Sequence, residues 1–437
     1  MADWVRILAD QRDDLARLPF ADYVQRERQT AIHLDSPLAQ VVIGVRRCGK
    51  TTLCHQVLHE AGVRYAYVNF DDELLARVRP EDLNDILQAA YVVYGDFTHV
   101  FLDELQNVSG WELFVNRLLR KGLHVLVTGS NGNLLSQEFG THLTGRYEEI
   151  ELQPFSFREF LAYRKDEGEA LTTRSRARRE VAYRLFSREG GLPEVYVLPD
   201  PVGYLKTLYN AILFKDVVKR WSVRYPTVLT DVASVLLANF CREINYAEIA
   251  KTLNVKSVHT VQNYVDYLEK AYLIATLDKY STKPVRRQQA QKAYATDLGF
   301  ASFFTGSDSS ADELGWRLEN LVFLELRAGR AAGRYELYYW KNGHEVDFVL
   351  VRGKRVVRLV QASYSISGDR ARAREVGALL AAARHLGCTD LEIVTFSESC
   401  EIVEDGQTIK VSAITDWLMR PGCFNGMAGL QDEQDER

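Results

Sequence analysis

The chain has 437 residues, of which 46% are hydrophobic and 26% charged, and it carries a formal net charge of −5. This composition is typical of a soluble globular protein with two or three domains, because the chain is too long for one ordinary core. The negative net charge excludes a general attraction to nucleic acid, so any contact with DNA requires a local basic patch.

The apolar segments and the cysteines bear on the location of the protein and on disulfides and zinc. There is no run of about 18 apolar residues and no signal peptide at the N-terminus, which predicts a cytoplasmic protein. The six cysteines are scattered, without CxxC spacing or nearby histidine pairs. We therefore expect free thiols and no structural zinc.

Residues 1–38 begin with a helical pattern. Its apolar positions are Val5, Leu8, Leu15 and Leu18. These positions favour a helix packed on the surface of a domain, and a lid or interdomain brace is the alternative.

Strand and helix patterns alternate from residue 41. The expected strands are 41–43, 65–70, 100–102 and 124–128, and the expected helices are 50–61, 80–93 and 111–121. This alternation predicts an α/β fold with a parallel sheet and crossover helices. Ligands in such sheets bind at the carboxyl ends of the strands.

The first strand runs into a glycine-rich loop of the P-loop type. Gly44 and Gly49 stand where a Cβ would obstruct a backbone that closes around a triphosphate. Lys50 is expected to reach the β- and γ-phosphates and Thr51 to ligate Mg²⁺. The other predicted nucleotide-binding residues of the loop are Arg46, Arg47, Cys48 and Thr52. A glycine-rich turn without a ligand is the alternative.

A second motif at residues 98–104 supports the nucleotide interpretation. It is a short apolar strand that ends in Asp103 and Glu104. We expect Asp103 to hold Mg²⁺ through water and Glu104 to polarise the attacking water. A helix N-cap is the alternative for an acidic residue after a strand.

Two further polar positions follow. Ser130 and Asn131 follow the strand 124–128 and are candidates for a residue that senses the γ-phosphate or orients the attacking water. An ordinary Asn-Gly turn at residues 131 and 132 is the alternative. Arg146 follows a glycine and is a candidate arginine finger, in the same subunit or the next, although a solvated surface arginine is the usual case.

These motifs carry a family resemblance. The segments concerned are 44–53, 69–71, 101–106, 128–130, 143–146 and 152–160. Residues 25–405 resemble prokaryotic AAA+ ATPases that end in a PD-(D/E)XK-like domain of unknown function. The resemblance implies an AAA+ core, a winged-helix middle and a nuclease-like fold at the end. It also implies ATP as the nucleotide, Arg146 as a finger or sensor, and Ser130 as a sensor.

Residues 161–228 have a charged helical pattern. The basic cluster at 174–179 fits a solvated helix face better than a nucleic-acid contact.

Residues 230–296 have the pattern of a helix-turn-helix. One short helix is expected at 245–253 and a second at 257–271, followed by a strand. The next segment resembles a wing, because it is basic from Lys279 through Lys292 and counts both of these lysines among its cations. The candidate DNA-binding residues are His259, Gln262, Lys279, Lys283, Arg286 and Arg287. The charges favour phosphate contact by the wing over base reading by the helix. Many such domains only pack other domains together.

The last domain carries an incomplete nuclease motif. The family comparison sets Glu319, Asp347 and Gln361 on the metal-ligand positions and Ser363 on the lysine position. Because serine carries no charge, we expect a nuclease-like fold that does not cleave DNA. The alternative for Asp347 is a purely structural role, as a buried carboxylate paired with an arginine. Residues 425–437 are expected to be disordered.

The sequence therefore predicts five parts. They are a P-loop ATPase core with an N-terminal helix (1–160), a helical lid or linker (161–228), a winged helix (229–297), a nuclease-like domain (298–405) and a tail (406–437). The expected function is a Mg²⁺-dependent ATPase that binds or remodels DNA as a homo-oligomer, without a membrane. The alternatives are a STAND-like signalling switch that does not touch DNA and an ATP-regulated DNA nuclease.

Overall fold

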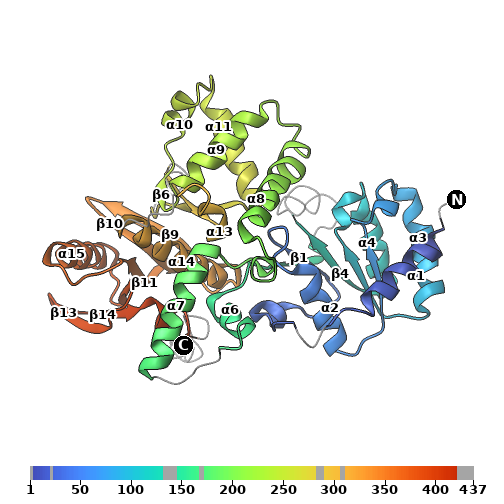
Figure 1. Cartoon of the computed structure of the whole chain (residues 1–437), viewed down its shortest axis with the longest axis horizontal. Helices are drawn as coiled ribbons and strands as arrows, with labels where there is room; N and C mark the ends of the chain where they lie inside the picture. The colour runs from blue at the N-terminus through green and yellow to red at the C-terminus, as the bar shows by residue number, and fades with distance from the viewer. Residues whose placement is uncertain are drawn as a thin grey trace. The chain divides into compact units, whose positions relative to one another are not determined.

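The computed structural model describes residues 3–19, 23–130, 145–166, 172–281, 290–305 and 311–420 (Figure 1). The chain divides into two compact units. The first contains residues 1–155 with the short segment 270–272, and the second contains the remaining residues from 156 onward. The finer division into five parts stays a prediction.

The first unit is built on a five-stranded sheet. In spatial order its strands are β2 (Tyr65–Asn69), β3 (His99–Asp103), β4 (His124–Gly129), β1 (Ala39–Ile43) and β5 (Tyr147–Glu151). Every neighbouring pair is parallel, as the alternating pattern predicted. β1 and β3 are buried along their whole length, which accounts for the apolar runs at 41–43 and 100–102 within them.

Helices connect and cover these strands. They are α1 (Trp4–Leu15), α2 (Lys50–Glu60), α3 (Leu83–Tyr94) and α4 (Trp111–Arg120), with short 3₁₀ turns at η2 (Glu27–Ala31), η3 (Glu73–Leu75), η4 (Pro80–Asp82) and η5 (Leu105–Asn107). α1 packs on α3 and β2. It is therefore a helix on the surface of this unit, which is the interpretation that its apolar positions favoured. Its buried face is Ile7, Leu8 and Gln11, whereas Val5, expected inside, is exposed.

The second unit opens with a helical segment. It contains α6 (Phe157–Tyr163), α7 (Thr173–Glu189), η7 (Pro193–Tyr196), α8 (Pro201–Ala211), the π-helical η8 (Ile212–Val218) and α9 (Pro226–Ala238). Ser156 begins α6 with a capping box, in which its hydroxyl accepts from the Glu159 N–H and the Glu159 carboxylate accepts from the Ser156 N–H.

The predicted helix pair follows as α10 (Tyr246–Thr252) and α11 (Val258–Lys270). Asn245 caps α10, and Asn254 adopts a left-handed φ of 53° in the turn between the helices. Val261, Val265 and Leu268 of α11 are buried, as its period predicted, whereas Val258, which we expected on the same inner face, is exposed. A three-stranded sheet in the order β6 (Arg242–Glu243), β8 (Gln291–Ala295) and β7 (Ile274–Asp278) adjoins them. The wing candidates Lys283, Arg286 and Arg287 lie outside the described residues.

A six-stranded mixed sheet ends the described chain. In spatial order it contains β13 (Cys400–Glu404), β14 (Gln407–Ala413), β12 (Leu391–Thr395), β11 (Arg355–Ala362), β10 (His344–Arg352) and β9 (Glu336–Asn342). The helices that contact this sheet are α14 (Ala311–Ala331), α15 (Asp369–Leu386) and α16 (Ile414–Trp417), whereas the short α13 (Leu298–Ala301) contacts α7, α8, α9 and β8. β14 and α16 lie past residue 405, where we expected a tail to begin, and β14 pairs with both β12 and β13.

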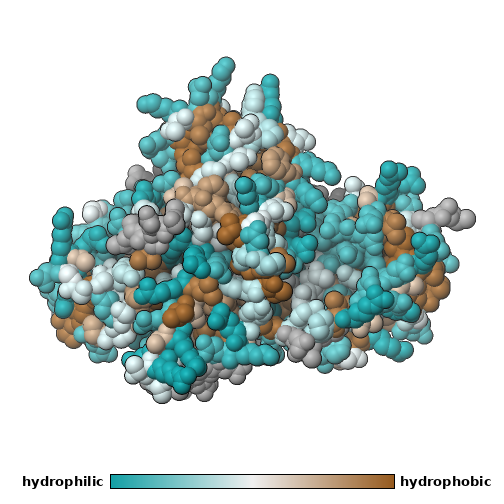
Figure 2. Space-filling model, in the orientation of Figure 1, coloured by the Kyte–Doolittle hydropathy of each residue, from teal (hydrophilic) through white to brown (hydrophobic). Residues whose placement is uncertain are grey.

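The surface is mixed in polarity. Hydrophilic residues cover most of the face in Figure 2, and apolar residues emerge in separate patches. Of the helices in the described ranges, none combines the length and apolarity needed to cross a membrane. The five cysteines in those ranges are free thiols, as their spacing predicted.

Asp297 anchors α13 inside the second unit. Its buried carboxylate accepts the backbone N–H groups of Gly191 (2.6 Å) and Gly299 (2.8 Å). Gly190 approaches it so closely that a Cβ at that position would lie 1.8 Å from Oδ1. Burial raises the pKa of Asp297 to about 6, although these N–H groups oppose the rise.

This raised pKa predicts a stability difference that depends on pH. The folded chain holds the Asp297 proton up to about pH 6, whereas the unfolded chain releases it near 3.8, so stability falls as pH rises between these values. The amide in the Asp297→Asn variant would not titrate. Between about pH 4 and pH 7, the free energy of unfolding of this variant should therefore gain about 3 kcal/mol relative to wild type. Urea unfolding of both proteins measures this change, and a constant difference would show that Asp297 is ionised throughout.

Candidate functional site

The loop between β1 and α2 has the backbone that the glycine pattern predicted. Gly44 has a φ of 149°, and a Cβ there would lie 2.1 Å from the carbonyl oxygen of Leu152. Gly49 precedes α2 with a left-handed φ of 98°. Arg26 braces the loop from outside it, because Nη1 donates to the Cys48 carbonyl (2.7 Å) and Nη2 to the Gln153 carbonyl (2.6 Å).

The side chains of the loop differ in their surroundings. Lys50 is buried, and its Nζ donates to the carbonyls of Gly44 and Val45, each at 3.1 Å. Cys48 is also buried and its thiol donates to the Leu152 carbonyl at 3.3 Å; burial raises the pKa of that thiol. The remaining predicted positions are more open: Arg46, Thr51 and Thr52 are half-buried and Arg47 is exposed with a left-handed φ of 69°.

The two predicted Mg²⁺ ligands meet in the structure. Thr51 Oγ1 lies 3.0 Å from both Oδ1 and Oδ2 of Asp103. The hydroxyls of Thr128 and Tyr67 also donate to this carboxylate, the latter at 3.2 Å. Burial and the neighbouring Glu104 raise the pKa of Asp103 to about 6, and the threonine hydroxyls oppose that rise.

Glu104 faces the same site. Its carboxylate Oε1 lies 4.0 Å from Lys50 Nζ, and Oε2 accepts from Ser130 Oγ at 3.2 Å and from the side-chain amide of Gln106. Its φ of 51° is left-handed, which is unusual for a residue with a side chain. Glu104 stands at the start of η5 but makes no side-chain capping bond, so the N-cap alternative does not account for its position.

Arg146 lies at the other edge of the sheet. It is exposed just before β5, where its carbonyl accepts the Ala39 N–H at the start of β1. The P-loop follows the opposite end of β1, about 13 Å away along the strand. The structure therefore does not bring Arg146 to the P-loop of its own chain. Asn131 lies outside the described residues.

The arrangement fits a Mg²⁺ nucleotide. A hydroxyl and a carboxylate are hard oxygen ligands of the kind that Mg²⁺ prefers, and the loop offers backbone N–H groups at the start of α2. The bonds of Lys50 to carbonyls of the loop can exchange for bonds to phosphate oxygens.

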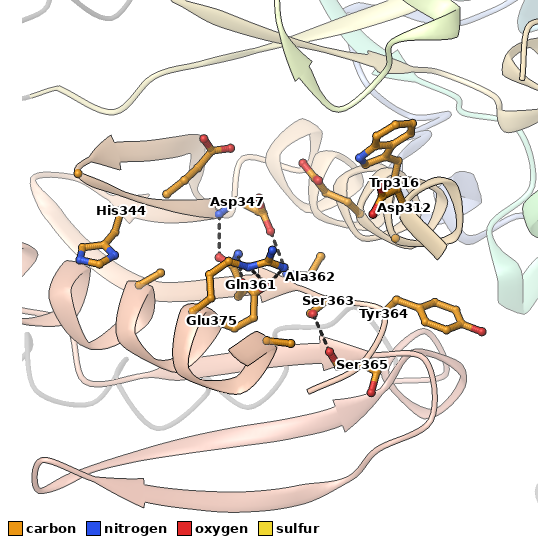
Figure 3. A pocket seen from close by; sticks show the side chains of 17 residues that line it. Asp312, Trp316, His344, Asp347, Gln361, Ala362, Ser363, Tyr364, Ser365 and Glu375 are labelled. Carbon is orange, nitrogen blue, oxygen red and sulfur yellow. Dashed lines mark hydrogen bonds and ion pairs between the residues drawn. The ribbon is translucent and has the colours of Figure 1, made fainter. Parts of the chain in front are cut away.

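The predicted nuclease motif surrounds a cavity of about 700 Å³ in the second unit (Figure 3). Glu319 of α14, Asp347 of β10 and Gln361 of β11 all line it. Gln361 Oε1 accepts the Asp347 N–H (3.2 Å) and its amide donates to Glu375 (2.7 Å). The Gln361 side chain is thus already engaged on both sides. Ser363 is uncharged and donates to the Ser365 carbonyl at 3.2 Å.

Lys292 of β8 corrects two predictions. We counted it among the cations of the exposed wing, and we expected the carboxylates of the motif to lack a cation. Instead Lys292 is buried, and its Nζ lies 3.1 Å from Glu319, 3.2 Å from Asp347 and 2.7 Å from Glu345. Asp347 therefore has a lysine as its partner in place of the arginine that we considered.

The hydrogen-bond donors of Lys292 are fully used in this cluster. An ammonium has three N–H donors, and three carboxylates lie within hydrogen-bond reach of Lys292. These carboxylates raise the pKa of Lys292, despite its burial. Burial and the charge of Asp347 raise the pKa of Glu319 to about 8. The cation that the nuclease motif has at the position of Ser363 is supplied here by Lys292 of β8, and its three N–H groups all face carboxylates.

The predicted DNA-binding residues that the structure describes do not gather at either site. His259 and Gln262 are exposed on α11. Lys279 is half-buried where the β7 strand ends, and its backbone N–H donates to Ala290.

Sequence reasoning missed three functional neighbours: Arg26, Thr128 and Lys292. Thr128 had a signal, since it is a polar residue in a buried strand beside the P-loop strand. Arg26 and Lys292 had none, because their partners lie far away in the sequence.

The Lys292 cluster yields a stability prediction. Lys292→Met leaves buried carboxylates without a counter-ion and should destabilise the second unit by about 3–5 kcal/mol. Hydrogen exchange of amides in β8 and β10 measures this loss. The control is Lys341→Met, which removes a 45% exposed partner of the same Glu345 and should change stability by less than about 1 kcal/mol. Equal effects of the two variants would show that burial of the cluster is unimportant.

Comparisons with known proteins fit this architecture. Residues 36–161 match the family described as an AAA domain, and residues 182–311 and 314–406 match two domains of unknown function. Among solved structures, the Walker-type ATPase of Pyrococcus abyssi is 16% identical, with a TM-score of 0.44 over 65% of this chain and 96% of that one. The Orc1 protein of Aeropyrum pernix in complex with DNA has 15% identity and a TM-score of 0.27, covering 69% and 90%. Likenesses at this level assign no activity.

Relatives are more similar in sequence. An uncharacterized protein of Haemophilus influenzae is 28% identical over 403 residues, which cover 88% of this chain and 95% of that one. The uncharacterized protein MJ1544 of Methanocaldococcus jannaschii is 32% identical over 383 residues, and the match covers 85% of each chain. The chain therefore belongs to the family of MJ1544, as a protein with an AAA domain followed by two domains of unknown function.

Proposed function

We propose that the chain is a Mg²⁺-dependent ATPase that couples hydrolysis to the binding or remodelling of DNA. The observation that carries the ATPase part is the meeting of Lys50, Thr51, Asp103 and Glu104 at one edge of the sheet. Mg²⁺ would supply the positive charge that offsets the phosphates. The choice of ATP rests on the AAA match to residues 36–161.

Each residue has a role that its contacts support. Thr51 and Asp103 hold the metal, Asp103 through water. Lys50 donates to the terminal phosphates once it leaves the carbonyls of Gly44 and Val45. Glu104 orients and polarises the attacking water, and the hydroxyl of Ser130 fixes the direction of its carboxylate. Arg146 would act as a finger on a neighbouring chain, since it lies away from its own P-loop.

Substitutions separate binding from hydrolysis. Lys50→Ala should abolish ATP binding or turnover, because it removes the phosphate-binding cation. Glu104→Gln should bind ATP normally but hydrolyse it roughly 10²- to 10⁴-fold more slowly, since an amide cannot act as a base. Phosphate release and fluorescent-nucleotide binding measure the two properties, with Glu73→Gln, an exposed glutamate of the same unit, as the control.

Two outcomes would contradict these assignments. Unchanged turnover in Glu104→Gln would remove Glu104 from the role of base. Turnover per chain that is independent of chain concentration, with only monomers present under ATP and Mg²⁺, would exclude a finger supplied in trans by Arg146.

The DNA part rests on the surface of the helix pair. His259, Gln262 and Asn263 form an exposed polar face on α11 and can bond to phosphates or base edges. Exposed Lys256 stands in the turn just before this helix and adds positive charge. The acidic Glu269 near the end of α11 is engaged elsewhere, because it accepts from the N–H and hydroxyl of Thr276. These features favour contact with the phosphate backbone.

DNA binding should depend on salt and on the wing. If Lys283, Arg286 and Arg287 each contact a phosphate, log affinity for duplex DNA should fall with log salt at a slope near −3. Their triple alanine variant should flatten that slope and remove DNA stimulation of the ATPase. The matched control is the triple alanine variant of Arg174, Arg176 and Arg178, three exposed arginines of α7.

The same titrations distinguish the alternatives. ATPase rates should be measured with single-stranded, duplex and branched DNA. An absence of binding at low salt, together with no effect of the wing variant, would favour the STAND-like switch. Cutting of DNA that is lost in Asp347→Ala but kept in Lys50→Ala would favour the nuclease, which the engagement of Lys292 with three carboxylates argues against.

A further inference from the structure

We propose that Asp35, His99 and His124 bind a transition-metal ion of the Zn²⁺ class at the edge of the first sheet away from the P-loop. His99 begins β3 and His124 begins β4, and the two are paired in register. Asp35 lies in the segment that precedes β1. One ligand atom from each residue lies within 4.8 Å of the others.

The two imidazoles are held side by side by the backbone. Adjacent parallel strands fix their Cα atoms, and the ring centroids lie 4.8 Å apart at 26°. His99 is buried, and its Nε2 has no hydrogen bond although almost no solvent reaches it. A buried polar nitrogen without a partner is costly, and a metal ion is one partner that would satisfy it.

Both imidazoles also have a hydrogen-bond partner at the opposite ring nitrogen. The Ser36 carbonyl lies 3.1 Å from Nδ1 of His124 and can only accept, so that nitrogen carries the hydrogen. Nδ1 of His99 lies 2.8 Å from the Thr98 hydroxyl, which in turn donates weakly to the Arg64 carbonyl at 3.5 Å. Either atom can donate in the bond between Thr98 and His99. At His124 the Nε2 atom keeps its lone pair, as in histidines that ligate metals through one nitrogen and donate from the other.

The surrounding charge also suits a cation. The Leu34 carbonyl and the Asp35 carboxylate place negative charge beside the His99 ring. An entering divalent ion would meet two imidazole nitrogens and one carboxylate.

The donor set selects the kind of metal. Two imidazoles and a carboxylate suit Zn²⁺ or Co²⁺ and are poor for Mg²⁺, which prefers oxygen ligands. Tetrahedral bonds of about 2.0–2.1 Å require ligand atoms about 3.4 Å apart, so the ligands must close by about an ångström. Asp35 is exposed on a turn and can move that far. This site departs from the sequence expectation of no structural zinc, which rested on the cysteines.

Metal at this position would tie the segment before β1 to the first residues of β3 and β4. β1 leads to the P-loop and β3 ends in Asp103. The ion would therefore fasten the near ends of strands whose far ends carry the nucleotide site. Its direct effect should be a higher unfolding temperature for the first unit.

The test is metal binding to the full chain after removal of metals by a chelator. With Mg²⁺ in excess, equilibrium dialysis should find one Zn²⁺ per chain, and Co²⁺ should give the intense visible absorption of a tetrahedral site. Asp35→Asn and His124→Gln each remove a direct ligand. Each should weaken Zn²⁺ binding by at least about 100-fold, because loss of a mere ligand partner already costs 10- to 100-fold.

The control is His33→Gln, an exposed histidine two residues before Asp35. It should bind Zn²⁺ like wild type and show the same rise in unfolding temperature. Asp35 is exposed, so its variant should fold, and circular dichroism of each chain confirms this. No Zn²⁺ bound by wild type at sub-millimolar metal, or binding retained in both Asp35→Asn and His124→Gln, would overturn the proposal.

Discussion

The nucleotide site depends on one buried carboxylate, Asp103. A carboxylate removed from water must find hydrogen-bond donors within the protein, and each bond to a charged acceptor contributes about 1.5–3 kcal/mol. Its donors are hydroxyls from three different elements: Thr51 of α2, Tyr67 of β2 and Thr128 of β4. Because β4 lies between β1 and β3, the hydroxyl of Thr128 spans the gap between the loop and the acidic strand end. Satisfying this one group fixes the relative position of all these elements.

The second unit also buries carboxylates, but it satisfies them with a lysine. Hydroxyls surround Asp103 and leave its negative charge in place, so the site still attracts a cation. The three carboxylates around Lys292 share an ammonium of the same unit, which lies within hydrogen-bond distance of each of them. The two carboxylate sites thus differ in their donors, which are hydroxyls at Asp103 and a fixed cation in the second unit. This difference is the physical reason for assigning metal chemistry to the first and a structural role to the second.

The sequence predicts those parts of the fold whose determinants lie close together in the chain. Strand and helix periods gave the parallel sheet, and the spacing of Gly44, Gly49 and Lys50 gave the loop. The meeting of Thr51 with Asp103 followed from the rule that parallel strands place their carboxyl ends at one edge. Lys292 could not be foreseen, because it is 55 residues from Asp347 and its basic neighbours imitated an exposed wing. The pairing of His99 with His124 likewise depends on strand order, which residue periods do not encode.

Gly44 is required by the packing of the sheet as well as by the shape of the nucleotide-binding loop. The carbonyl of Leu152 lies so near that any side chain at position 44 would collide with the end of β5, whether or not a nucleotide is bound. Glycine is thus demanded there by the packing of the sheet itself. A relative that had lost nucleotide binding would still keep this glycine while its equivalents of Lys50 and Glu104 became free to drift. A loss of nucleotide binding would therefore show at the lysine and the glutamate, whereas the glycine would stay unchanged.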